Sequence, residues 1–198
     1  MTERVDQVLY IPGLNDQSNF NKKMANGVQG NLEKHGVQVT VFKPHWYTEE
    51  PFQQKIERLV REIDDLSSRG SVFIIGQSAG GSLAGEGFIE RRDTVNGLVI
   101  VAGRLKQGEN LDKAAKKSQS FKESVLSFEK HESNLTVDDR KRIMTIRLLL
   151  DQEVTKKTAF IAGANNKTVP IPEHVIGGYS VYKFYGKKIV DFLRSLKK

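Results

Sequence analysis

Short apolar runs alternate with amphipathic stretches along the first hundred residues. The runs typical of buried strands lie at residues 7–12, 37–42, 71–76 and 97–102. The stretches between them that are typical of helices lie at about 20–32, 52–66 and 79–90, the last of these being rich in glycine. Strands that alternate with helices at this spacing predict βαβ units and a mostly parallel sheet with helices on both faces, a three-layer α/β fold.

The pattern changes after residue 103. Residues 104–143 are polar and rich in lysine, and Thr136 and Asp139 have the spacing of a capping box before a short helix. We interpret this segment as a helical excursion over the carboxyl edge of the sheet. Residues 144–150 could continue this helical segment or return the chain to the sheet as a strand, and we favour the strand. A last amphipathic helix is predicted around residues 185–196.

Composition limits the class of protein. The 198 residues, of which 38% are hydrophobic and 28% charged, are enough for one core, so we predict a single domain over residues 1–198. The absence of cysteine excludes disulfides, thiolate metal sites and a cysteine nucleophile. Neither an apolar secretory signal nor a membrane-length apolar stretch is present, so we expect a cytoplasmic protein without a membrane span.

The net charge of +7 would allow weak attraction to anionic partners. Residues 183–198 hold six Lys or Arg and one Asp, a distribution typical of a solvated helix face. We therefore do not expect nucleic acid to be the main partner. No spacing of His, Asp and Glu resembles a metal site, and we expect no cofactor. The oligomeric state is not specified by any pattern.

The clearest chemical motif is Gly76-Gln77-Ser78-Ala79-Gly80, which matches G-x-S-x-G between a predicted strand and a predicted helix. A serine at such a tight turn projects its hydroxyl from the sheet edge, and only small neighbours let strand and helix approach closely. The amino terminus of the helix directs backbone N–H groups toward developing negative charge. The motif therefore indicates Ser78 as a catalytic nucleophile.

With this motif the sequence resembles the α/β-hydrolase superfamily over nearly its whole length. The segment Ile11-Pro12-Gly13-Leu14-Asn15 is similar to the loop that helps to form the oxyanion hole in that superfamily. The resemblance implies an oxyanion hole built from the backbone N–H groups of Ala79 and Leu14. Asn15 and Gln77, beside these positions, are candidate substrate-binding residues.

The superfamily's chain order is nucleophile, acid, histidine, and two assignments satisfy it here. In the first, Asp151 ends the predicted strand in Leu148-Leu-Leu-Asp151-Gln-Glu-Val154, which resembles the superfamily's acid turn. His174, after the strand-like residues 167–171, is then the base. The 23 residues from Asp151 to His174 can hold one reduced crossover and a strand.

In the second assignment, Gly163-Ala-Asn-Asn166-Lys-Thr-Val-Pro170 resembles the superfamily's G-x-x-D-x-x-V-P. This alignment puts Asn166 at the acid position and Tyr179 at the base position, and it describes a non-catalytic binding protein with a degenerate triad. We favour the first assignment because an imidazole has a pKa near neutrality and a second nitrogen for an orienting carboxylate. An ordinary tyrosine, with a pKa near 10, is a poor base.

The hypothesis is therefore a serine hydrolase that cleaves a small ester, thioester or related acyl compound through an acyl-enzyme. Ser78 is the nucleophile, His174 the base and Asp151 the orienting acid. His45 and Trp46, which follow the second predicted strand, are further candidates for lining a substrate pocket at the carboxyl edge.

Overall fold

The computed structural model describes residues 5–108, 111–151, 153–172 and 175–197. Its strands are β1 (Gln7–Ile11), β2 (Gln38–Val41), β3 (Val72–Gln77), β4 (Val95–Val101), β5 (Ile143–Leu148) and β6 (Asn165–Val169). Its longer helices are α1 (Asn19–Glu33), α2 (Phe52–Ser67), α3 (Gly80–Glu90), α5 (Gln119–His131) and α8 (Val175–Ser195). The short ones are α4 (Leu111–Ala115), η1 (Glu132–Asn134), α6 (Val137–Lys141) and α7 (Lys156–Ala159). Within the described residues, no helix is both long and apolar enough to cross a membrane.

The strands form one sheet in the order β2-β1-β3-β4-β5-β6, and every pair of neighbours is parallel. The prediction of a parallel α/β sheet is confirmed. Because the strands are parallel, all of them end at the same edge, and the loops that follow β1, β3, β4 and β5 meet there. Ligands of such sheets bind at this edge.

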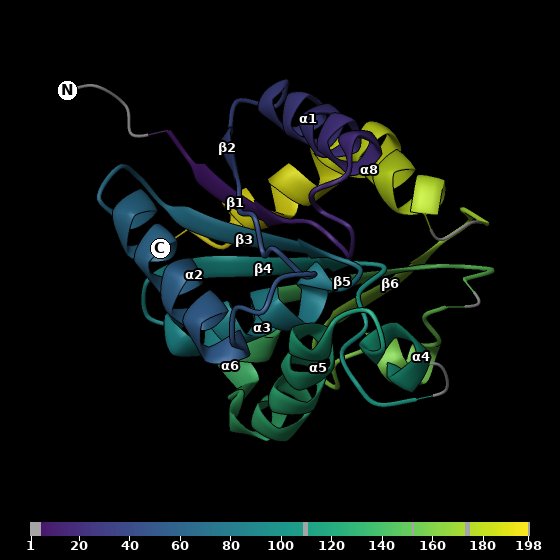
Figure 1. Ribbon diagram of the computed structural model, residues 1–198. Helices are drawn as coiled ribbons and strands as arrows, with labels where there is room; N and C mark the ends of the chain where they lie inside the picture. The colour runs from purple at the N-terminus through teal and green to yellow at the C-terminus, as the bar shows by residue number, and fades with distance from the viewer. Residues whose placement is uncertain (1–4, 109–110, 152, 173–174, 198) are drawn as a thin grey trace.

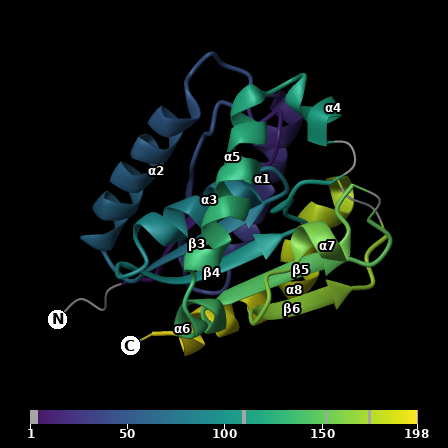
Figure 2. The same ribbon diagram turned by 90° about the horizontal axis from the view of Figure 1, so that it is seen from below.

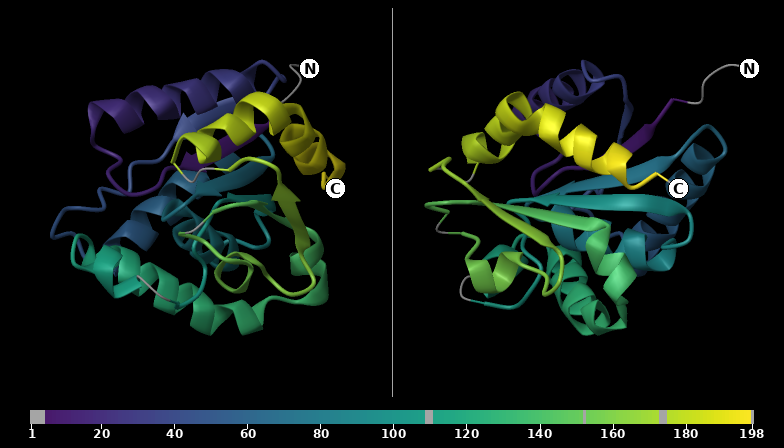
Figure 3. Two further views of the ribbon diagram at one scale, coloured as in Figure 1. Left: turned by 90° about the vertical axis from the view of Figure 1, so that its right-hand side faces the viewer. Right: turned by 180° about the vertical axis from the view of Figure 1, so that it is seen from behind.

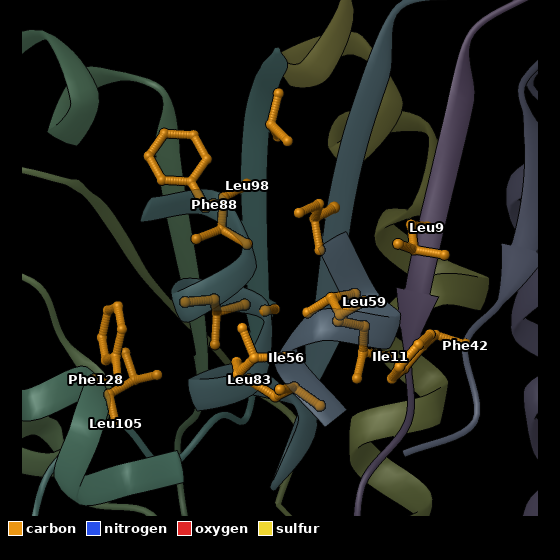
Figure 4. Close-up of a cluster of buried hydrophobic side chains, with 14 of the residues drawn as sticks. Leu9, Ile11, Phe42, Ile56, Leu59, Leu83, Phe88, Leu98, Leu105 and Phe128 are labelled. Atoms are coloured by element: carbon orange, nitrogen blue, oxygen red, sulfur yellow. The ribbon is translucent and has the colours of Figure 1, made fainter. Parts of the chain in front are cut away.

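Helices cover both faces of the sheet (Figure 1). The helices α1 and α8 lie on one face, and α2, α3 and α5 lie on the other, as Figures 2 and 3 also show. Side chains along β1 alternate between the two cores: Val8 and Tyr10 pack under α1 and α8, whereas Leu9 and Ile11 pack under α2 and α3 (Figure 4). This alternation is the period of two that a strand buried on both faces requires.

Local sequence explains where the helices begin. The Ser18 side chain accepts a hydrogen bond from the Asn21 N–H, so Ser18 caps α1 and Asn19 is its first helical residue. Thr136 and Asp139 form the predicted capping box at α6.

Residues 104–143 connect β4 to β5 through α4, α5, η1 and α6. The helix α5 packs along α3 beneath the sheet, where Gly85 lies against the ring of Phe128. The amino-terminal end of α5 reaches the carboxyl edge, where Phe121 is buried. The segment thus contributes both to a helical layer and to the walls of the edge.

The predicted strand at residues 144–150 is present as β5. A single turn of helix, α7, then connects β5 to β6, which is the reduced crossover that the sequence predicted. The last helix, α8, begins near the carboxyl edge and returns across the sheet, with its buried side chains packed on β4.

Candidate active site

Ser78 lies in the tight turn between β3 and α3. Its φ of +51° falls in the left-handed region, which costs a non-glycine residue about 1–3 kcal/mol. The Ser78 N–H donates to the carbonyl oxygen of Val101 at 3.0 Å, and the Ser78 carbonyl oxygen accepts from the Gly81 N–H at 3.0 Å. Hydrogen bonds on both sides therefore maintain a strained conformation at the carboxyl end of β3.

Two glycines let the loop after β1 approach this turn. A Cβ on Gly80 would overlap the carbonyl oxygen of Ile11, and a Cβ on Gly13 would lie 3.0 Å from the Cβ of Ser78. Any larger residue at Gly80 would push the two segments apart. Gly13 of the loop after β1 and Gly80 of the serine turn thus allow the same close contact between these two segments.

A cavity of about 440 Å³ opens beside Ser78, and its volume is in the range of small-molecule sites. Its lining residues are Gly13, Leu14, Asn15, Phe20, Asn21, Gln77, Ser78, Ala79, Arg104, Phe121, Glu153, Val154 and Tyr179. The structure thus brings Ser78 together with four of the other candidate residues, namely Leu14, Ala79, Asn15 and Gln77.

Hydrogen bonds fix the floor of the cavity. The Tyr10 hydroxyl donates to Oε1 of the buried Gln77 at 2.7 Å. A Cβ on Gly178 of α8 would lie 3.0 Å from Nε2 of Gln77, so α8 packs directly on this amide. The Tyr179 hydroxyl donates to Oδ1 of Asn21 on α1 at 3.3 Å. The Gln77 side chain, next to Ser78, is therefore held between β1 and α8 by a hydrogen bond on one side and by packing on the other.

Asp151 lies just beyond β5 and is buried. Its Oδ1 accepts hydrogen bonds from the N–H groups of Glu153 and Val154, both at 2.9 Å. These two hydrogen bonds fix the position of the carboxylate in the turn after β5. Because Glu153 and Val154 line the cavity, Asp151 is tied to the cavity wall.

Asn166 occupies the acid position of the second assignment, and its side chain forms hydrogen bonds with β5 and with the turn before β6. Its Oδ1 accepts from the Thr145 hydroxyl at 2.6 Å and from the Ile161 N–H at 3.2 Å. Its Nδ2 donates to the carbonyl oxygens of Ile161 at 2.8 Å and Ala164 at 3.2 Å. Asn166 lies beside Thr145 in the register of β5 and β6, three residues and roughly 10 Å before the end of β6. This amide shapes the turn that leads into β6.

We predict that Asn166→Ala lowers the free energy of unfolding by about 2–4 kcal/mol, because several half-buried hydrogen-bonding groups lose their partner. Urea denaturation followed by circular dichroism measures the change. Asn165→Ala is the matched control, since Asn165 is the preceding residue of the same strand and makes no side-chain hydrogen bond among the described residues. Equal stabilities for the two variants would contradict the structural role of Asn166.

Tyr179, the base position of the second assignment, does line the cavity. It comes from α8, and only a small part of it is exposed. Burial raises the pKa of Tyr179 above its ordinary value. The phenol therefore stays protonated near neutral pH and acts there as a hydrogen-bond donor.

His174 lies outside the described residues. The described chain resumes at the start of α8, whose Gly178 and Tyr179 contact Gln77 and the cavity respectively.

The structure places His45 and Trp46 away from this cavity. The backbone N–H groups of both residues donate to the carboxylate of Asp16, at 2.9 and 3.3 Å. Trp46 is 1% exposed, its indole N–H donates to the Pro12 carbonyl oxygen at 3.3 Å, and its ring meets Phe121 edge to face. His45 lines a separate surface hollow with Arg58 and Arg61. Trp46 supports the cavity wall from behind and does not line it.

Sequence reasoning missed several lining residues. Phe20 begins the stretch predicted to form the first helix, but it is 52% exposed and lines the cavity. Phe121 and Arg104 come from the segment after β4. For Arg104 a signal was available, because it follows the carboxyl end of a predicted central strand, where ligands bind in such sheets.

The fold is similar to that of solved structures, although the sequence matches no known family profile and no curated protein. Among solved structures, the chain is similar to one described with LipS and LipT, two metagenome-derived lipolytic enzymes (TM-score 0.72, 14% identity, 96% of this chain and 94% of that one).

Two further solved structures are similar over nearly the whole chain. One is Est1E from Butyrivibrio proteoclasticus (TM-score 0.68, 13% identity, 98% of this chain and 89% of that one). The other is alpha/beta hydrolase domain-containing protein 10 from mouse (TM-score 0.65, 15% identity, 96% and 90%). Together with the parallel sheet, these similarities establish that the protein has the α/β-hydrolase fold.

Proposed function

We propose that the protein is a serine hydrolase that cleaves a small ester, thioester or related acyl compound. The observation that carries the proposal is Ser78, held at φ +51° at the carboxyl end of β3 and open to a cavity of about 440 Å³. Stored backbone strain at a cavity-lining serine is typical of a catalytic nucleophile. The lipolytic activity of a protein with a similar fold agrees with this chemistry.

In the proposed reaction, His174 accepts the hydroxyl proton of Ser78 while Oγ attacks the acyl carbon. The negative oxygen of the tetrahedral intermediate accepts hydrogen bonds from the backbone N–H groups of Ala79 and Leu14. When the intermediate collapses, the bond to the leaving oxygen or sulfur breaks, and His174 gives that atom its proton. Water then attacks the acyl-enzyme in the same way, which releases the carboxylic acid and restores Ser78.

Asp151 is the proposed acid that orients His174 and stabilises its protonated form. Its two backbone hydrogen bonds support this role, because they hold the carboxylate in one position. Its short distance in sequence from the cavity-lining Glu153 and Val154 supports it further.

The alternative, a non-catalytic binding protein with Asn166 and Tyr179 at the acid and base positions, has less support. The amide of Asn166 is engaged with Thr145, Ile161 and Ala164, well before the strand end. Burial raises the pKa of Tyr179, so near neutral pH even less of its phenol is deprotonated and able to accept a proton than in an ordinary tyrosine.

We expect a fluorophosphonate probe to label the purified wild-type protein, because an activated serine displaces fluoride from phosphorus. Ser78→Ala and His174→Ala should abolish labelling, and Ser67→Ala, which changes a half-exposed serine at the end of α2, is the matched control. In-gel fluorescence and the mass of the labelled peptide give the readout. A folded wild-type protein that stays unlabelled would favour the binding protein of the second assignment. Labelling that persists in His174→Ala would contradict the role of His174 as the base.

A further inference from the structure

The segment that follows β4 places a buried cationic side chain, Arg104, in the wall of the cavity beside Ser78. Ala102 adopts φ +47°, and its N–H donates to the carbonyl oxygen of Ile146 at 2.7 Å. A Cβ on Gly103 would overlap the side chain of Ile100, so this turn is as tight as the one at Ser78. The Arg104 N–H then donates to the carbonyl oxygen of Ser78 at 3.4 Å. The serine turn and the arginine turn are therefore linked.

The Arg104 side chain lines the same cavity as Ser78 and is 7% exposed. Its Nη1 donates to the carbonyl oxygen of Glu153 at 3.5 Å, and its Nη2 would lie 3.2 Å from a Cβ on Gly108. Burial lowers the pKa of the guanidinium, but an arginine starts so high that it keeps its charge at neutral pH. Arg104 thus places a positive charge at the wall of the cavity of Ser78, and a guanidinium is a group that recognises carboxylates through paired donors.

The other charged group among the described lining residues is Glu153. Its side chain is exposed, so water screens its carboxylate, whereas Arg104 is largely removed from water. Several neighbours in the lining are apolar, including Leu14, Phe121 and Val154. Electrostatic attraction between Arg104 and a bound anion is stronger in such surroundings than in water.

We propose that Arg104 determines specificity by binding a carboxylate on the acyl part of the substrate. This inference rests on the proposed function: the substrate would be a monoester or monothioester of a small dicarboxylic acid, with its ester carbonyl at Ser78 and its free carboxylate at Arg104. A carboxylate fits better than a phosphate, because one planar guanidinium matches one carboxylate in charge and in paired donors.

The test measures binding to Ser78→Ala protein, so that it does not depend on turnover. Monomethyl glutarate and methyl pentanoate have the same acyl chain length and differ in the terminal carboxylate. Chemical-shift titrations of ¹⁵N-labelled protein give both dissociation constants, and the Nε–H signal of Arg104 reports contact with the carboxylate. We expect monomethyl glutarate to bind about 10- to 100-fold more tightly, as a desolvated charge-assisted hydrogen bond implies.

Adding Arg104→Gln should remove that preference, and Arg104→Lys should restore part of it. Arg61→Gln, which changes an arginine in a separate surface hollow, is the matched control. Equal affinities of the two esters, or a preference that persists in Arg104→Gln, would overturn the inference. Should Arg104→Gln fail to fold, the comparison of the two esters and the Arg104→Lys variant still decide. Failure of the proposed function would instead appear as an unlabelled Ser78 in the fluorophosphonate experiment.

Discussion

Replacing Ser78 with alanine is expected to lower the turnover of p-nitrophenyl pentanoate by about 10³- to 10⁶-fold. The hydroxyl oxygen is the atom that forms the acyl-enzyme, and no second described serine lines the cavity. The residual rate should stay above the rate in water, because the oxyanion donors and the cavity remain. Release of p-nitrophenolate, followed by absorbance, measures the loss.

The fold of the Ser78→Ala variant should be unchanged, because alanine is about as disfavoured as serine at φ +51°. Its melting temperature should therefore match that of the wild type. Ser78→Gly is an informative companion: it should be equally inactive but more stable, by about 1 kcal/mol, because glycine adopts positive φ without strain. Wild-type turnover in a correctly folded Ser78→Ala protein would refute the mechanism.

The second large effect is expected from Asp151→Asn, with a loss of about 10⁴-fold in kcat. The asparagine oxygen can still accept from the N–H groups of Glu153 and Val154, so the turn after β5 should persist. The negative charge that stabilises protonated His174 is lost, and an amide can also hold the imidazole in the wrong tautomer. Steady-state kinetics with p-nitrophenyl pentanoate test this, with urea denaturation as the check on stability.

Asp151→Asn is expected to lose activity and keep its fold, and Asn166→Ala is expected to show the opposite effects. It should weaken the fold while the folded fraction keeps a reactive Ser78, because Asn166 bonds within the sheet and not at the cavity. If instead Asp151→Asn remained fully active, Asp151 would not be the orienting acid, and a folded but inactive Asn166→Ala would contradict the purely structural role of Asn166.

The sequence was most informative where local pattern and burial coincide. The continuous apolar runs at β3 and β4 are buried on both faces, and that burial requires their composition. Two connections were also predictable, namely the turn at Ser78 and the single-turn crossover through α7. In each, sequence length or small side chains leave few possible conformations.

The lining of the cavity was much less predictable. Phe20, Phe121 and Tyr179 come from α1, α5 and α8. The sequence assigned no role to Phe20 or Phe121, and it singled out Tyr179 only as the base position of the second assignment. Which of these side chains reaches Ser78 depends on how the three helices pack on the sheet. Trp46, in contrast, was expected to line the cavity, but hydrogen bonds to Asp16 and Pro12 hold it in the interior.

By itself, then, the sequence determined the parallel α/β sheet, the strand–turn–helix position of Ser78 and the strand that leads to Asp151. These features depend on residues close together in the chain, whose periodicity and size record burial directly. Only the tertiary structure decided that Asn166 bonds within the sheet and that Arg104 faces the cavity of Ser78. Both outcomes depend on strand order and helix packing, which bring distant residues together and leave no local pattern in the sequence.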